Sequence, residues 1–287
     1  MGLLQFFKMP EAIRRHVIRH YLNKIIQNKS SYEIMGAKNL FKLFRRIPGL
    51  CVEIESDEYK LKLTNETPGI NVYARKYPCS DLITLLEVWG KQEYREAIEM
   101  LTTKGIHDPH ILDVGGNVGY AVVYFKYYFP SASVICIEPD RLNQNQIFKN
   151  TKVNGFKGIT LVAGALWRKR TKMEIKNDYR EGTSASFYVI ESDKGDIEGY
   201  GIKDILSIQN WKYIDLLKMD IEGAEKYLFE DENIAATILS ITRVIAIEIH
   251  DEKADRQKIC KALSTNGFKF FTKGETTFGL NENSTFI

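Results

Sequence analysis

Short apolar runs recur through the second half of the chain, and most of them end at a glycine or an acidic residue. Five runs have the length and composition of buried parallel strands: Ile111–Val114, Val134–Ile137, Ile159–Ala163, Ile214–Met219 and Val244–Ile249. Stretches of helical length follow several of them, at Tyr120–Phe129, Arg141–Asn154 and Asp251–Thr265. Strands that alternate with helices predict an α/β fold with a mostly parallel sheet.

Two antiparallel additions to this sheet are also predicted. At the C-terminus, Phe268–Thr272 and Thr276–Leu280 have the pattern of a final hairpin. Earlier, Lys172–Ile175 and Ala185–Ile190 resemble an inserted antiparallel pair. The insert holds two serines that are candidates for contact with an acceptor molecule, Ser184 and Ser186.

The N-terminal part has a different pattern. From Pro10, which suits the first turn of a helix, apolar residues recur at helical spacing with Lys and Arg between them: Ile13, Val17, Ile18, Tyr21, Leu22, Ile25 and Ile26. Two interpretations of this basic amphipathic helix stay open. It packs its apolar stripe on the protein core, or it rests on an anionic membrane surface with the help of apolar side chains in residues 3–7.

A small β-rich unit is predicted next. Cys51–Glu55 and Tyr59–Leu63 alternate around a polar turn and predict a hairpin, and Ile70–Ala74 predicts a third strand. A helix capped by Ser80 or Asp81 follows them. We expect the helical stretch to cover the binding site of the larger part or to line the cleft for an acceptor, and no catalytic residue is indicated in it.

Charge supports the same division of the chain. Residues 1–50 hold ten Lys and Arg against two Glu, whereas the remainder holds thirty Lys and Arg against thirty-five Asp and Glu. At 287 residues and 44% hydrophobic content, the chain suits one large domain with an extension. We therefore predict a basic helical extension (1–50), a β-hairpin and helical cap region (51–107) and a ligand-binding α/β domain (108–287).

These totals also limit location and partners. The mildly acidic larger part makes nucleic acid an unexpected partner. No apolar run approaches the ~20 residues of a membrane-spanning helix, and Met1–Lys8 does not resemble a secretory signal. The four cysteines are scattered as in proteins with reduced thiols: Cys51, Cys79, Cys136 and Cys260. We expect a cytoplasmic protein, with peripheral contact at the inner membrane face left open by the basic helix; the sequence does not indicate the oligomeric state.

The residues with the clearest chemistry follow the first strand of the α/β domain. Gly115, Gly116 and Gly119, with Asn117 between them, allow a sharp turn and close approach of a ligand to the backbone. The glycine spacings of dinucleotide sites and of P-loops are both absent. Asp113 would repel a pyrophosphate and attract a sulfonium, which favours a cationic nucleoside such as S-adenosylmethionine. The alternative is an ordinary glycine turn between a strand and a helix.

The next strand ends in an acid. Glu138 lies 25 residues after Asp113, close to where βαβ nucleoside sites place the acid that binds the ribose diol. A carboxylate accepts two hydroxyl hydrogen bonds at once. At the end of the third strand, the small Gly164 and Ala165 would let an adenine ring lie against the backbone, although plain turn residues explain them equally well.

Together these segments resemble the FkbM-type methyltransferases. The resemblance covers roughly residue 75 to the C-terminus and is carried by four runs in the family's order: Asp113–Gly119, Ile137–Asp140, Leu217–Glu225 and Ile247–His250. Gly116 stands where the family often has alanine. The resemblance implies a class I, Rossmann-like fold with a seven-stranded, mostly parallel sheet and an antiparallel C-terminal strand. It also implies an S-adenosylmethionine-dependent O-methyltransferase.

Candidate catalytic groups lie at the ends of the fourth and fifth strands. Asp220 ends the fourth strand at the edge where open α/β sheets bind ligands, so it is a candidate for cofactor contact and for catalysis. His250 follows the fifth strand and has the intrinsic pKa of a general base near neutral pH. A structural histidine is the alternative.

The same strand ends predict a possible metal site. Asp220, Glu248 and His250 offer two carboxylates and one imidazole, a set that suits Mg²⁺ or Mn²⁺ better than zinc. A metal would lower the pKa of an acceptor hydroxyl and orient it. Glu248 paired with a lysine or pointing into the sheet is the structural alternative.

The acceptor is predicted to be an oxygen. The Asn/Asp-Pro-Pro-Tyr/Phe signature of amino-group methyltransferases is missing, and Asp220–Gly223 stands in its place. The family resemblance points to hydroxyls of sugars, glycans or secondary metabolites. A non-catalytic S-adenosylmethionine-binding module and, more remotely, an NAD(P)-binding enzyme remain as alternatives.

Overall fold

The computed structural model describes residues 9–25, 32–176 and 188–283. The candidate serines Ser184 and Ser186 and the apolar residues 3–7 lie outside these ranges. Of the side chains of residues 20–34 nothing is described either, so the apolar stripe of the N-terminal helix is followed here only to Ile18.

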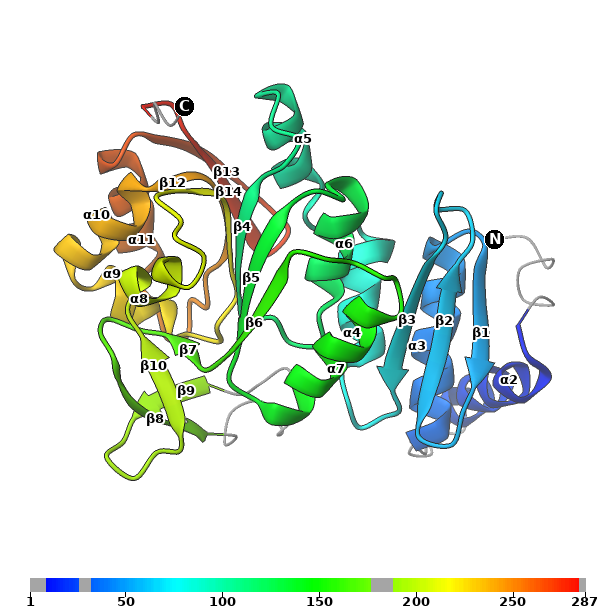
Figure 1. The fold of residues 1–287 in the computed structure, drawn as a ribbon. Coiled ribbons are helices and arrows are strands. Elements are labelled where there is room, and N and C mark those ends of the chain that lie inside the picture. Colours follow the sequence, from blue (N-terminus) through cyan, green and yellow to red (C-terminus); the bar gives the residue numbers. More distant parts are fainter. Residues whose placement is uncertain (1–8, 26–31, 177–187, 284–287) are drawn as a thin grey trace.

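A seven-stranded sheet forms the centre of the larger domain (Figure 1). In spatial order its strands are β13 (Phe268–Lys273), β14 (Thr276–Asn281), β12 (Thr242–Glu248), β11 (Ile214–Met219), β4 (His110–Val114), β5 (Ser133–Glu138) and β6 (Ile159–Ala163). Only β14 runs antiparallel to its neighbours, β12 and β13. The predicted class I sheet with its antiparallel C-terminal strand is therefore confirmed. The chain order reverses direction across the sheet between β4 and β11, the place where such sheets bind ligands.

Helices cover both faces of this sheet because its strands are apolar on both sides. On one face lie α6 (Tyr120–Tyr128) and α7 (Arg141–Lys152), and on the other α8 (Ile202–Ser207), α9 (Glu225–Phe229), α10 (Glu232–Ser240) and α11 (Arg256–Thr265) (Figure 1). Neighbouring residues of one strand join different cores: Ile111 packs on the α6 side, and Leu112 packs on the α8–α11 side. The prediction of a helix from Asp251 is wrong at its start, because Asp255 caps α11 by accepting from Lys258 N.

The predicted insert forms a separate four-stranded sheet after β6. Its order is β7 (Ala165–Leu166), β10 (Ile197–Tyr200), β8 (Thr171–Lys176) and β9 (Tyr188–Glu191). β8 and β9 are antiparallel, as predicted for the inserted pair.

The N-terminal part packs as a helical pair on a small sheet. α2 (Glu11–Ile25) lies against α3 (Tyr32–Arg46), which was not predicted as a helix, and β1 (Leu50–Ile54), β2 (Glu58–Leu63) and β3 (Ile70–Arg75) form the predicted antiparallel meander. Ile13 and Val17 are each 3% exposed. That burial favours the core-packing interpretation of the stripe, while membrane contact stays a prediction.

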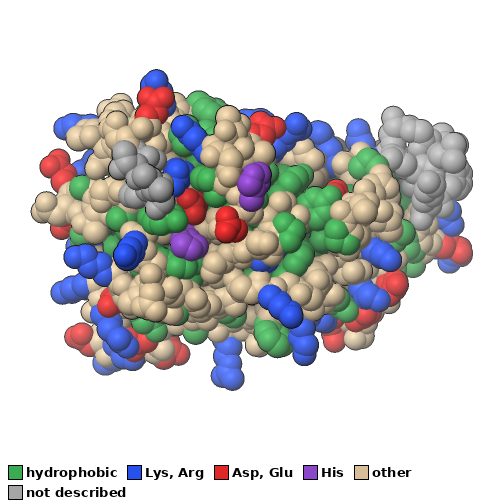
Figure 2. All heavy atoms as spheres, turned by 45° about the horizontal axis from the view of Figure 1, so that its top comes forward, with side chains coloured by type: hydrophobic (Ala, Val, Ile, Leu, Met, Phe, Trp, Pro, Cys, Tyr) green, Lys and Arg blue, Asp and Glu red, His purple; other side chains and the backbone are tan. Residues whose placement is uncertain are grey.

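The cap region links the small sheet to the larger domain. α4 (Asp81–Leu85), a π-helical turn η1 (Leu86–Gly90) and α5 (Arg95–Thr103) run over the tips and face of the central sheet. Among the described residues, no helix combines the length and the apolar composition that crossing a bilayer requires. On the face that Figure 2 presents, Lys and Arg side chains lie among Asp and Glu side chains, so the basic charge there is dispersed.

Candidate active site

A cavity of about 350 Å³ opens at the carboxyl edge of the central sheet. The tips of β4, β5, β11 and β12 and the segment after β6 form one part of its wall, and α4, η1 and the β13–β14 turn form the other. Eight of the predicted residues lie on this wall: Gly115, Gly116, Asn117, Glu138, Gly164, Ala165, Asp220 and Glu248. Three do not: Asp113, Gly119 and His250.

Packing forces the glycine turn. Gly115 has φ +83°, and a Cβ there would lie 1.8 Å from the carbonyl oxygen of Asp220. A Cβ on Gly116 would lie 2.2 Å from Cys136 Sγ. The turn is thus pressed against β11 and β5, and Gly115 N and Gly116 N both donate to the carbonyl oxygen of Ile137. A larger side chain at either glycine would displace the turn.

Gly119 has a structural position. It also has positive φ, and a Cβ there would meet Ile147 Cα of α7 at 3.0 Å. Gly119 therefore lets α6 and α7 approach closely behind the wall, and a cofactor contact by Gly119 stays a prediction.

Glu138 is fixed at the tip of β5 by backbone donors. Asn117 N donates to Oε2 at 2.7 Å, and Asp140 N donates to Oε1 at 2.9 Å. Burial raises the pKa of Glu138 to about 7, although these donors oppose the rise. Glu138 lines the cavity, and a carboxylate there could accept the two hydroxyls of a ribose.

Asp113 lies one layer below the wall. It is fully buried, and Lys218 Nζ is 3.1 Å from its Oδ1. Lys218 also donates to the carbonyl oxygen of Gly115 at 2.5 Å. Burial opposes the charge of Lys218, but Asp113 and Asp220 outweigh it and raise the pKa of that ammonium. Asp113 thus holds the lysine that supports the glycine turn, and it does not face the cavity.

His250 lies close to three carboxylates, two of which, Asp220 and Glu248, belong to the predicted metal site. Nε2 of His250 lies 3.9 Å from Asp220 Oδ1, 3.6 Å from Glu248 Oε1 and 3.5 Å from Glu222 Oε2. The His250 side chain is only 2% exposed, so the wall carboxylates separate it from the cavity. Among the described residues, one group of this kind could hold a metal ion, namely Asp220, Glu248 and His250.

Glu225 orients the imidazole from behind. Its Oε1 accepts from the backbone N–H of His250 at 2.8 Å and lies 3.0 Å from Nδ1, and its Oε2 accepts from Gly223 N. Burial opposes a charged imidazole, but Glu225 and Asp220 raise the pKa of His250. Burial and Asp220 raise the pKa of Glu248. In the sequence, Glu225 stands out only as the end of a family motif, which does not indicate this contact.

Four further acids on the wall were not among the candidate site residues: Glu87, Glu93, Glu222 and Glu275. Thr276 Oγ1 donates to Glu93 Oε1 at 2.9 Å. Burial and the charge of Asp220 raise the pKa of Glu93 to about 7. Glu87, Glu93 and Glu275 lie outside the strand ends and motifs that mark the candidate residues, so no local pattern distinguishes them. Lys218 is the one basic side chain among the described residues that line the cavity.

Comparison with known proteins agrees with this arrangement. The family profile described as "Methyltransferase FkbM domain" matches residues 113–270, more than half of the chain. The chain belongs to the FkbM methyltransferase family. The matched range begins at Asp113 and includes the tips of β5, β11 and β12. Family and fold together make this chain a methyltransferase whose methyl donor is S-adenosylmethionine.

Individual relatives are distant. Over 185 residues the chain is 22% identical to Methyltransferase 1 of Beauveria bassiana (strain ARSEF 2860), covering 56% of this chain and 72% of that protein. Solved structures with similar folds include the METTL16 MTase domain, at 12% identity and a TM-score of 0.46, covering 88% of this chain and 80% of that one. Another is the precorrin-6y C5,15-methyltransferase from Geobacter metallireducens GS-15, at 11% identity and a TM-score of 0.40, covering 66% and 86%.

Proposed function

We propose that this FkbM-family methyltransferase transfers the methyl group to a hydroxyl oxygen of a sugar, a glycan or a secondary metabolite. The observation that carries the proposal is a single cavity with two unlike ends. A buried carboxylate on backbone donors, Glu138, lies over β5, and the carboxylates Asp220 and Glu248 lie over β11 and β12.

The cofactor end has the groups that S-adenosylmethionine needs. Glu138 would accept the ribose hydroxyls, and Gly164 and Ala165 leave room for the adenine. Oδ1 of Asn117 is buried and has no hydrogen-bond partner among the described residues, so it is an acceptor for a donor group of the ligand. When bound, the cofactor supplies an activated methyl group on a positively charged sulfur, which the wall carboxylate Asp220 would favour.

We assign removal of the acceptor proton to the wall carboxylates. Glu248 faces the cavity, and its raised pKa suits a general base near neutral pH. Asp220 shares that wall. His250, one layer behind, acts as a positioning residue, because its ring points at both carboxylates and Glu225 fixes its other side.

A divalent cation, Mg²⁺ or Mn²⁺, belongs to the same proposal. Asp220, Glu248 and His250 each offer one ligand atom, and these atoms lie within 4.8 Å of one another. Glu225 on the far nitrogen of His250 is the kind of partner that orients ligating histidines. Such an ion supplies Lewis acidity toward a hydroxyl oxygen. Mn²⁺ titration followed by electron paramagnetic resonance should show binding that His250→Ala abolishes and Glu138→Ala leaves unchanged. Equal binding by all three proteins would remove the ion from the proposal.

The central test measures S-adenosylhomocysteine formation with a panel of hydroxyl acceptors. Glu248→Gln should lower the rate by about 10²–10⁴-fold while its affinity for S-adenosylhomocysteine, measured by calorimetry, changes little. Glu99→Gln on the exposed side of α5 is the matched control. Binding without product on any hydroxyl acceptor would instead support the non-catalytic binding module.

A further inference from the structure

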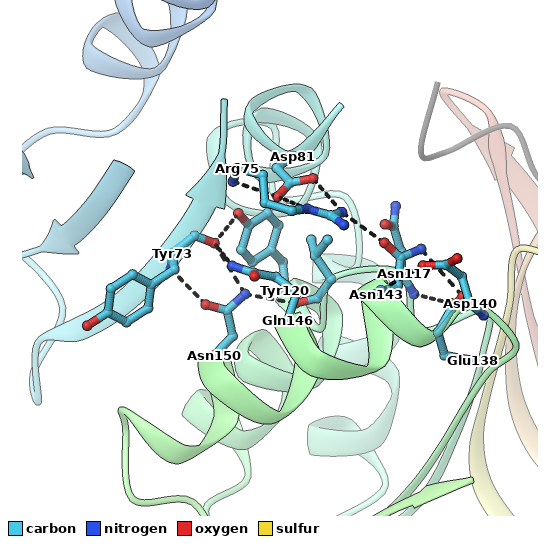
Figure 3. Close-up of polar contacts among 11 residues, drawn as sticks. Tyr73, Arg75, Asp81, Asn117, Tyr120, Glu138, Asp140, Asn143, Gln146 and Asn150 are labelled. Atoms are coloured by element: carbon cyan, nitrogen blue, oxygen red, sulfur yellow. Dashed lines mark hydrogen bonds and ion pairs between the residues drawn. The ribbon is translucent and has the colours of Figure 1, made fainter. Parts of the chain in front are cut away.

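The small N-terminal sheet reaches the cofactor site through a chain of polar contacts (Figure 3). These contacts begin at Arg75, the last residue of β3, and end at Glu138, the last residue of β5. In sequence these residues lie in different predicted regions of the protein, and no sequence pattern indicates a role for Arg75.

The first link fixes the arginine. Asp81, which is fully buried at the start of α4, accepts from Arg75 three times: from backbone N at 2.8 Å, from Nε at 3.0 Å and from Nη2 at 2.9 Å. A guanidinium held by a carboxylate in this forked geometry has little freedom to turn. Arg75 is therefore a rigid donor.

The second link sets the direction of an amide. Arg75 Nη2 also donates to Oδ1 of Asn143, at 2.8 Å. Arginine has no acceptor atom, so the oxygen of the Asn143 amide must face Arg75 and its NH₂ group must face away. That NH₂ group lies 3.4 Å from Glu138 Oε1.

The third link is the carboxylate itself. Asn117 N holds one oxygen of Glu138 and Asp140 N holds the other, and Asn143 adds a third donor. With the amide reversed, Asn143 would present an oxygen to Glu138, and the two would repel. Figure 3 shows Arg75, Asn143 and Glu138 in line along the start of α7.

We propose that Arg75 is a positioning residue for the ribose-binding carboxylate, acting through Asn143, and that the N-terminal sheet is therefore part of the cofactor site. This inference rests on the proposed function, because it assigns Glu138 to the ribose hydroxyls. It predicts that a change in β3 alters recognition of the ribose specifically, with the rest of the cofactor bound as before.

The test compares two ligands, S-adenosylhomocysteine and its analogue without the ribose 3′-hydroxyl, by calorimetry. Arg75→Lys keeps a positive charge opposite Asp81 but lacks the fork that reaches Asn143 as well. Asn143→Leu removes the amide and leaves the Arg75–Asp81 pair in place. Each substitution should weaken the binding of S-adenosylhomocysteine about fivefold to tenfold and change the affinity for the analogue less than twofold. The double variant should bind S-adenosylhomocysteine no more weakly than either single variant.

Asn154→Ala is the matched control. Asn154, two residues after the end of α7, pairs with the backbone of Asn71 on the same β3 strand: its Oδ1 accepts from Asn71 N and its Nδ2 donates to Asn71 O. No contact between Asn154 and Glu138 is found among the described residues. If Arg75 only holds β3 against α7, Asn154→Ala and Arg75→Lys should both weaken the binding of the two ligands to the same extent. That result would overturn the inference. Unchanged affinities in Arg75→Lys and Asn143→Leu would overturn it too, with the proposed function intact. If the wild-type protein bound the analogue as tightly as S-adenosylhomocysteine, both this inference and the assignment of Glu138 to the ribose hydroxyls would be overturned.

Discussion

The two ends of the cavity are built in opposite ways. Over β4 and β5, the backbone N–H groups of Asn117 and Asp140 hold one acid, Glu138, and packing leaves no room for side chains in the glycine turn. Over β11, β12 and β14, the wall consists of carboxylates from separate segments, among them Glu93, Asp220 and Glu248. At the end over β4 and β5, the shape of the backbone selects the ligand. At the end over β11, β12 and β14, which we call the acid end, negative charges are concentrated, and their positions depend on the whole fold.

Lys218 joins the two ends, so its removal should have the largest effect. Lys218→Met leaves Asp113 as a buried charge without its partner, and such losses destabilise by about 3–5 kcal/mol. It also frees the carbonyl of Gly115. We expect a large fall in the free energy of unfolding in urea, together with lost cofactor binding.

The combined variant Asp113→Asn with Lys218→Met is its control. Replacing both charges removes the unpaired carboxylate, so much of the stability should return. A Lys218→Met protein as stable as the wild type would show that the ion pair does not hold the two ends together.

A substitution at Glu138 should affect ligand binding at the cofactor end of the cavity and leave the acid end unchanged. Glu138→Ala removes the acceptor for two ribose hydroxyls, and charged hydrogen bonds contribute about 1.5–3 kcal/mol each. Affinity for S-adenosylhomocysteine should fall by about 10²-fold or more. Mn²⁺ binding at Asp220 and His250 should be unchanged in the same protein. Loss of both would mean that the ends are not independent.

The same contrast explains what the sequence could predict. The strands of the sheet, its mostly parallel character and the glycine turn follow from local runs such as Ile111–Val114 and from the family motifs. Glu138 was found because it ends a strand at a known distance from Asp113. A site made of neighbouring residues leaves a pattern in the sequence, whether or not each residue touches the ligand.

The acid end left no such pattern. Glu93 enters the wall only because η1 and α5 fold over the sheet tips, and Thr276 holds it from the β13–β14 turn 183 residues away. The helix α7 was predicted, but not that its Asn150 and Gln146 pair with the backbone of Tyr73 on the edge strand β3 (Figure 3). These roles depend on long-range contacts, so no periodicity in the chain encodes them.

Gly116 tests how tightly the backbone end is packed. Gly116→Ala, the residue common in the family, would place its Cβ 2.2 Å from Cys136 Sγ. Overpacking of this kind destabilises by about 1–3 kcal/mol. Cys136→Ala should restore the lost stability in the double variant, because it removes the clashing sulfur. Additive losses in a double-mutant cycle of thermal unfolding would show that Cys136 does not fill the space of the missing methyl group.

Glu93 gives the smallest effect and tests the charge of the acid end. Its pKa of about 7 in the folded protein lies above the ordinary value of 4.5, so the folded state binds more protons than the unfolded state between these values. Stability therefore falls as pH rises from about 4.5 through 7. Glu93→Gln keeps an acceptor for Thr276 and has no proton to lose. The excess of its free energy of unfolding over that of the wild type should therefore be larger at pH 8 than at pH 4.5. If the free energy of unfolding changed with pH equally in both proteins, Glu93 would have to be ionised in the folded state well below neutral pH. The acid end would then hold several ionised carboxylates without destabilising the fold.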